Sequence, residues 1–279
     1  VATAAPTSLF EVVRQRARDA GHILAAIDGI APAAAVDGGH LRNSCANGSL
    51  PVHAVPPIPA ALSYAELLQA AERLAGALAP MLGGAGLAVT GGAADDAQAS
   101  VVSTFMKRGN SWYCVFCAAM RLQVPVASLS CDLPDRAAEQ RRNAEILTAH
   151  RPAVIVVGDN ANPDCLAAGD ISAQAALAAA DVRRFGELWA CAWAPDWRVA
   201  PESAGSLDAT LCYCYTGGTT KASRCARVTH RMALHEIATY PHVVSLGPTD
   251  RVLQPHSLYW AASAFGEVDI ALAFGSCLI

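Results

Sequence analysis

Residues 215–224 read Tyr-Thr-Gly-Gly-Thr-Thr-Lys-Ala-Ser-Arg, a run of glycines and hydroxyls that carries two cations. The apolar run 209–214 before it predicts a buried strand, and residues 228–231 after it open a helical pattern. Glycines let a backbone approach an anion and turn its N–H groups inward, while cations neutralise its charge. The segment therefore predicts a phosphate site, with an ordinary polar loop as the alternative. Its candidate ligands are Thr216, Gly217, Gly218, Thr219, Thr220, Lys221 and Arg224.

Strands and helices alternate along the middle of the chain. Such alternation, with helices of ten to fifteen residues, is typical of a parallel sheet in an α/β fold. We therefore expect layered, mostly parallel sheets flanked by helices. The expected strands are 101–106, 125–130 and 152–157, and the expected helices are 112–122, capped by Asn110 or Ser111, and 135–149.

The flanking regions contain further helices and one irregular stretch. Ser63 and Glu66 have the spacing of a capping box at the start of an amphipathic helix. Gly, Pro, Ala and Asn dominate about residues 21–60, which predicts a loop-rich insertion. The other expectations are helices at 8–18, 170–188 and 232–240, a connection at 189–207, and strands at 87–90 and 250–254.

Charge and hydropathy exclude several classes of protein. The net charge of -4 gives no reason to expect a nucleic acid or an anionic membrane as partner. No apolar run approaches the ~20 residues that span a bilayer, and no signal-peptide pattern opens the chain, so we expect a cytoplasmic protein.

The chain begins at Val1 and stops at Ile279 inside an apolar run, which favours a piece of a longer protein.

The ten cysteines are scattered, several of them in apolar runs. We expect buried free thiols, because a chain of this size without a secretion signal seldom relies on disulfides. Cys114 and Cys117 have Cys-x-x-Cys spacing, but no second pair accompanies them, which favours core packing over a metal or redox site. His235-Glu236 does not form a zinc-protease motif, because the next histidine is His242.

The order of residues in the glycine-rich segment resembles the signature loop of the adenylate-forming superfamily, which includes acyl-CoA synthetases and adenylation domains of nonribosomal peptide synthetases. The family pattern is Tyr-Thr-Ser-Gly-Thr-Thr-Gly-x-Pro-Lys-Gly-Val, followed by Thr-His-Arg. Residues 215, 216, 218–220 and 228–231 match it. Five positions depart from the pattern: Gly217 replaces serine, Lys221 glycine, Ser223 proline, Arg224 lysine and Cys225 glycine.

Two other passages resemble the same family. Leu62-Ser63-Tyr64-Ala65-Glu66-Leu67 is similar to its Leu-Thr-Tyr-x-Glu-Leu motif. Residues 120–134 follow its Leu-Lys-Ala-Gly-Ala-x-x-Val-Pro-Leu-Asp-Pro passage without gaps. The resemblance thus extends from about Leu9 to Ile279. It implies that residues 1–279 are a partial N-terminal adenylation (AMP-binding) domain from the large domain of such an enzyme.

The acyl pocket is implied by a third family motif. Amino-acid-activating members carry Phe-Asp-x-Ser, whose aspartate anchors the ammonium; here Trp260, Ala261, Ala262 and Ser263 take its place. A buried ammonium without a counter-charge costs several kcal/mol. The resemblance therefore favours a less polar acid beside Trp260, and core packing of Trp260 is the alternative.

The resemblance implies an ATP-dependent ligase that activates an amino, fatty or aryl acid as acyl-AMP for thioester formation. The intact enzyme would use ATP and Mg²⁺, a small carboxylic acid, and CoA or a phosphopantetheine carrier protein. The motifs for adenine and ribose and the C-terminal catalytic lysine do not occur, so no catalytic residue or metal ligand is assigned. A degenerate, non-catalytic domain that serves structure or interaction is the alternative. An unrelated phosphate-binding α/β module is a third.

Overall fold

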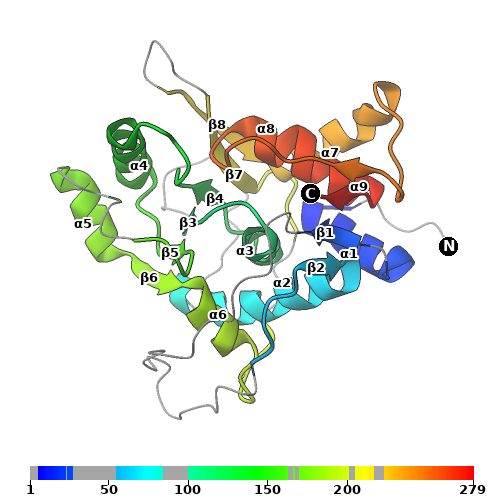
Figure 1. Cartoon of the computed structure of the whole chain (residues 1–279), viewed down its shortest axis with the longest axis horizontal. Helices are drawn as coiled ribbons and strands as arrows, with labels where there is room; N and C mark the ends of the chain where they lie inside the picture. Colours follow the sequence, from blue (N-terminus) through cyan, green and yellow to red (C-terminus); the bar gives the residue numbers. More distant parts are fainter. Residues whose placement is uncertain are drawn as a thin grey trace.

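The computed structural model describes residues 6–22, 24–27, 55–83, 100–162, 166, 170–200, 205–216 and 223–279. They form two sheets with helices between and around them (Figure 1). The larger sheet has the order β6-β5-β3-β4-β7-β8 and is parallel except for β8, which is antiparallel to β7. Its strands are β3 Val102–Phe105, β4 Val126–Ser128, β5 Val154–Val157, β6 Asp181–Arg184, β7 Thr210–Tyr215 and β8 Cys225–Thr229.

Helices cover both faces of this larger sheet, as a buried parallel sheet requires. On one face, alternate strand residues such as Val102 and Val154 join the core of α2, α3 and α6. On the other, Ile155 and Val157 pack with α4 and α5 (Figure 1). These helices are α2 Tyr64–Leu78, α3 Asn110–Leu122, α4 Arg136–His150, α5 Ile171–Ala179 and α6 Phe185–Ala192.

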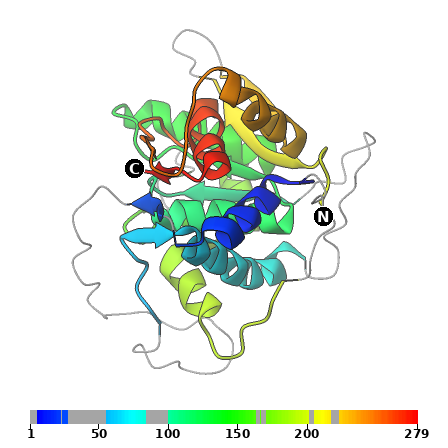
Figure 2. The same ribbon diagram turned by 90° about the vertical axis from the view of Figure 1, so that its right-hand side faces the viewer.

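The smaller sheet has the order β2-β1-β10-β9, and joins strands from both ends of the chain. β1 Leu24–Ile27 pairs antiparallel with β2 Ala61–Ser63 and parallel with β10 Cys277–Leu278, which pairs parallel with β9 Arg251–Val252. Helix α1 lies against α2 on one side and the C-terminal helices on the other (Figure 2). The remaining helices are α1 Leu9–Ala20, η2 Ala79–Leu82, α7 His230–Thr239, η4 Tyr240–His242, α8 Ala261–Ser263, the π-helical η5 Ala264–Val268 and α9 Asp269–Phe274.

The structure confirms the α/β class, the three central strands and the helices that flank them. Ser63 and Glu66 form the expected capping box, with the Ser63 hydroxyl accepting the Glu66 N–H at 3.3 Å and Glu66 Oε2 accepting the Ser63 N–H at 2.8 Å. The strand expected at 87–90 and most of the insertion at about 21–60 lie outside the described ranges. None of the helices in the described parts of the chain is both long and apolar enough to cross a membrane.

Three strands correct the sequence predictions. β6 interrupts the helix expected at 170–188, and α6 extends into the connection expected at 189–207. β8 contains Val228 and Thr229, which were expected to open a helix, and β1 lies within the predicted insertion. β6 and β8 are edge strands with polar and partly exposed residues, so they lack the apolar pattern of a buried strand.

Two smaller predictions also fail. Gly109, rather than Asn110 or Ser111, occupies the N-cap of α3, because its φ of 140° suits a glycine and the helix already begins at Asn110. Cys191 is disulfide-bonded, although buried thiols at Cys117, Cys212 and Cys277 agree with expectation. Sequence spacing cannot show which sulfur atoms a fold brings together.

Candidate functional site

The two described ends of the signature segment are held together by their backbones. Thr216 directly follows β7 and Arg224 directly precedes β8. The Thr216 N–H donates to the Arg224 carbonyl at 3.0 Å, and the Arg224 N–H donates to Thr216 Oγ1 at 3.1 Å. The Ser223 hydroxyl donates to the Thr216 carbonyl at 2.8 Å. These bonds close the base of the loop.

The loop base presents donors toward solvent. Thr216 and Arg224 are both exposed. Because Thr216 Oγ1 accepts the Arg224 N–H, its own hydrogen remains able to donate to an anion. The residues present at the base thus fit a phosphate ligand. The other predicted phosphate ligands, Gly217, Gly218, Thr219, Thr220 and Lys221, lie outside the described residues.

The predicted acyl motif lies beside the start of the signature segment. Tyr215, the last residue of β7, forms an isolated parallel bridge with Trp260, and its N–H donates to the Tyr259 carbonyl at 2.9 Å. Trp260 is half-buried, whereas Ala261 and Ala262 are exposed. Segments that are separate in sequence therefore meet at the carboxyl end of β7. In open α/β sheets, ligands bind outside the carboxyl ends of parallel strands.

A polar network, buried at Tyr113, Gln254 and Ser263 and exposed at Arg108, fixes the chain that carries the acyl motif. The Tyr113 hydroxyl donates to Gln254 Oε1 at 2.6 Å, and Gln254 Nε2 donates to Ser263 Oγ at 2.7 Å. Arg108 donates to the Gln254 carbonyl at 3.3 Å and the His256 carbonyl at 2.8 Å. The sequence alone does not reveal these positioning residues, because no local motif connects α3 with residues 254–263.

Charged side chains also surround the acyl motif. The Arg142 guanidinium lies 4.4 Å from the centre of the Tyr259 ring. His256 Nδ1 contacts Glu267 Oε1, and the Ser257 hydroxyl donates to Asp132 Oδ1 at 2.6 Å. Within the described part of the chain, no group of three or more His, Cys, Asp or Glu residues could hold a metal ion.

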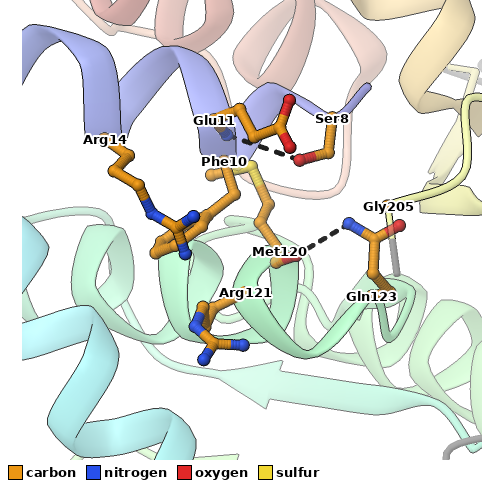
Figure 3. Close-up of a pocket in the computed structure, with 8 residues that line it drawn as sticks. All are labelled: Ser8, Phe10, Glu11, Arg14, Met120, Arg121, Gln123 and Gly205. Atoms are coloured by element: carbon orange, nitrogen blue, oxygen red, sulfur yellow. Dashed lines mark hydrogen bonds between the residues drawn. The ribbon is translucent and has the colours of Figure 1, made fainter. Parts of the chain in front are cut away.

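A separate pocket lies between α1 and the C-terminal end of α3 (Figure 3). None of its lining residues belongs to the signature segment or the acyl motif. Its polar groups are engaged locally, since Ser8 Oγ accepts the Glu11 N–H at 3.4 Å and Gln123 Nε2 donates to the Met120 carbonyl at 3.2 Å. The lining consists of Ser8, Phe10, Glu11, Arg14, Met120, Arg121, Gln123 and Gly205.

Three solved structures have the same fold. ATP-bound MatB from Rhodopseudomonas palustris matches with a TM-score of 0.67 and 17% identity, over 99% of this chain and 45% of that one. The N-terminal domain of FACL13 from Mycobacterium tuberculosis gives 0.65 and 18%, over 98% and 56%. The N-terminal subdomain of Klebsiella oxytoca NpsA, in complex with 3-hydroxybenzoyl-AMSN, gives 0.65 and 17%, over 97% and 53%.

The sequence comparison identifies the family. No curated protein matches the chain. The chain spans about half the length of the solved structures described above, and at these identities their likeness shows the fold alone. Residues 53–279, however, match the family of AMP-binding enzymes. That match covers most of the chain, and the fold agrees with it. This chain therefore belongs to the AMP-binding enzyme family.

Proposed function

We propose that residues 1–279 are the N-terminal part of an adenylation domain in an ATP-dependent, AMP-forming ligase that activates a carboxylic acid for thioester formation. The observation that carries this proposal is the convergence at the end of β7, where the closed loop base at Thr216 and Arg224 meets the acyl motif at Trp260. Two similar structures support the ligand classes, because MatB is ATP-bound and the NpsA subdomain holds 3-hydroxybenzoyl-AMSN.

The proposed roles follow from the chemistry of each group. The Thr216 hydroxyl donates to a phosphate oxygen, and the Arg224 guanidinium neutralises phosphate charge. Gly217, Gly218, Thr219, Thr220 and Lys221 supply the remaining loop contacts. In the family reaction a carboxylate attacks the α-phosphate of ATP and releases pyrophosphate. Mg²⁺, when bound by the intact enzyme, would screen the phosphate charge.

The acyl substrate is proposed to be a carboxylic acid without an ammonium at the family's anchor position. Ala261 and Ala262 offer no counter-charge there, and Trp260 offers an apolar ring that is half-buried. An aryl or fatty acid suits such a wall better than an α-amino acid does. The acceptor would be the thiol of CoA or of a phosphopantetheine carrier, and the partners include the remainder of a larger chain.

Arg224→Ala tests the phosphate assignment. We expect it to weaken ATP binding by about 1–3 kcal/mol, the range for a hydrogen bond to a charged group. Isothermal titration calorimetry with ATP measures the change. Arg227→Ala is the matched control. Arg227 is exposed, as Arg224 is, but it lies within β8 and donates to Thr210 Oγ1 at 3.5 Å. Equal ATP affinities of the wild type and Arg224→Ala would exclude Arg224 from the site.

The second candidate is a degenerate adenylation-like domain used for structure or interaction. The departures at Gly217, Lys221, Ser223 and Cys225 favour it, because they change the hydroxyls and glycines of the loop. ATP separates the candidates, since a ligand that binds only the native state raises the melting temperature. A melting temperature that stays constant over a wide range of ATP concentration would favour the non-catalytic domain.

A further inference from the structure

The acyl motif lies beside an imidazole to which the proposed function gives no role. His256 Nδ1 contacts Glu267 Oε1, and the rings of His256 and Trp260 have centroids 5.9 Å apart and planes inclined at 41°. His256 precedes the motif in sequence, whereas Glu267 follows it in η5. The fold thus brings a histidine–carboxylate pair to the ring that is proposed as the wall of the acyl site.

The two members of this pair differ in exposure. The Glu267 side chain is 9% exposed, and its Oε2 atom is buried with no hydrogen-bond partner among the described residues. The His256 side chain is 42% exposed. Because Nδ1 faces the buried carboxylate, the exposed edge of the ring is the opposite one, which carries Nε2.

The carboxylate also fixes which nitrogen of the imidazole carries hydrogen. A carboxylate only accepts hydrogen bonds, so the Nδ1 atom of His256 donates its hydrogen to Glu267. In the neutral ring, Nε2 then holds a lone pair and acts as an acceptor. The pair therefore presents a hydrogen-bond acceptor beside Trp260.

The backbone that carries this imidazole is held in place. Arg108 donates to the His256 carbonyl at 2.8 Å. The Ser257 hydroxyl donates to Asp132 Oδ1 at 2.6 Å. The Trp260 N–H donates to the Ser257 carbonyl at 3.0 Å, which closes a turn between the two rings. A side chain fixed in this way loses little freedom when a ligand binds, so the imidazole is preorganised for recognition.

The activation step leaves recognition as the task of this imidazole. In that step a carboxylate attacks the α-phosphate, and no proton has to be removed from the acid. Ala261 and Ala262 are exposed and carry no polar side-chain atom, so they offer the acyl group no hydrogen bond. We propose that His256, oriented by Glu267, is a specificity-determining residue that accepts a hydrogen bond from a hydroxyl group on the acyl part of the substrate.

This inference deepens the proposed function and rests on it, since the acyl site must lie at Trp260 for His256 to meet the substrate. The substrate class is then a hydroxy-substituted aryl or fatty acid. A methyl ether of such an acid keeps the oxygen but has no hydrogen to donate, so it leaves Nε2 unpaired. A site built to hydrogen-bond a substrate hydroxyl discriminates against an analogue that cannot form the bond.

The test measures the binding of acids to the 279-residue protein by ligand-observed NMR titration in the presence of ATP. Each hydroxy acid is compared with its own methyl ether. An aryl arm uses the three monohydroxyphenylacetates. An aliphatic arm uses two hydroxyoctanoates, one hydroxylated near the carboxylate and one at the far end of the chain.

Two variants accompany the wild type. His256→Phe keeps an aromatic ring beside Trp260 but removes both nitrogens. His242→Phe is the matched control, because His242 is exposed on η4. We expect at least one hydroxy acid to bind the wild type and His242→Phe roughly three- to tenfold more tightly than its ether does, the range for one hydrogen bond. In His256→Phe the two affinities should be equal. The arm that shows the preference identifies the acid as aryl or aliphatic.

Two results would overturn the role of His256: equal binding of every hydroxy acid and its ether to the wild type, or the same preference in His256→Phe. Circular dichroism establishes that each variant is folded, and the comparison within the wild type needs no variant. In both results acids still bind, so the proposed function stands. If no acid binds although ATP raises the melting temperature, the acyl site at Trp260 fails together with this inference, and the phosphate site stands.

Discussion

Burial shifts the pKa values of two ionisable residues near the C-terminal helices in opposite directions. Burial, together with the charge of Glu236, raises the pKa of Asp269 to about 7. Burial lowers the pKa of His230 to about 4. Between about pH 4 and 6.5, the folded state holds the extra proton at Asp269 and the unfolded state holds it at His230. The two contributions to the pH dependence of stability therefore nearly cancel in the wild type.

Asp269→Asn should stabilise the protein above pH 7. Asp269 Oδ2 is buried and has no hydrogen-bond partner among the described residues, while Oδ1 accepts the Gly266 N–H at 2.8 Å, a bond that asparagine keeps. The stability from the protonated carboxyl is complete below the unfolded pKa, near 4, and lost as pH rises through 7. We expect a gain on the order of 2 kcal/mol at pH 8, below the roughly 4 kcal/mol of the full shift. Urea unfolding measures it.

Asp196→Asn, at an exposed position, is the control for this experiment and should leave the free energy of unfolding unchanged at pH 8 and at pH 3.5. The gain from Asp269→Asn should disappear near pH 3.5. A loss of stability at pH 8 would contradict the idea that the buried carboxyl destabilises the fold at that pH.

His230→Asn should remove a loss of stability in acid. The imidazole is neutral in the fold, with Nδ1 accepting the Leu9 N–H at 3.2 Å, and within the described part of the chain its buried Nε2 has no hydrogen-bond partner. The unfolded chain takes up a proton below about pH 6.5, so His230 costs stability from there down to pH 4, by at most about 3 kcal/mol. The asparagine oxygen can replace Nδ1 as acceptor. Unfolding from pH 7 to 4 should show stability rising toward acid in this variant, because His230 then no longer offsets the contribution of Asp269.

At the scale of single elements, the caps of α2 and α3 differ. Ser63→Ala removes the acceptor of the Glu66 N–H at the start of α2 and should cost about 1 kcal/mol. Ser111 lies near the start of α3, where the N-cap is Gly109 and no side chain caps the helix. Ser111→Ala should therefore cost only a few tenths of a kcal/mol. Paired denaturant melts of the two variants measure the difference. Equal losses would place a cap at Ser111 after all.

Local chemistry made some elements and part of the candidate site predictable. Val154–Val157 is apolar throughout, and Ser63 with Glu66 is a local signal, so both elements could be read from the sequence. Asp181–Arg184 is a charged edge strand whose pairing depends on β5. The signature residues were identified by order, but the bonds between Thr216 and Arg224 depend on β8 turning back along β7, which no local pattern indicated.

Across the whole molecule, one apolar core connects the two sheets. Leu62 and Leu278 from the smaller sheet belong to the same buried cluster as Val102 and Val126 from the larger one. Helices α2 and α3 contribute the side chains between them. Because neither sheet has an independent core of that size, we expect them to unfold together. Thermal melts followed by far-ultraviolet circular dichroism and by tryptophan fluorescence should coincide, and two separate midpoints would contradict a shared core.

The pairing of β1 with β10 also has a consequence for biosynthesis. Ala26 and Leu278 are register partners, although they come from opposite ends of the sequence. A ribosome that is still adding the middle of the chain has already released β1 and β2, but it has not yet made the strand that lies beside β1. Long-range pairings of this kind form late, and domains fold in the order in which their parts become available. All strands of the six-stranded sheet are therefore synthesised before the last strand of the four-stranded sheet, which can be completed only when the last residues of this sequence are available.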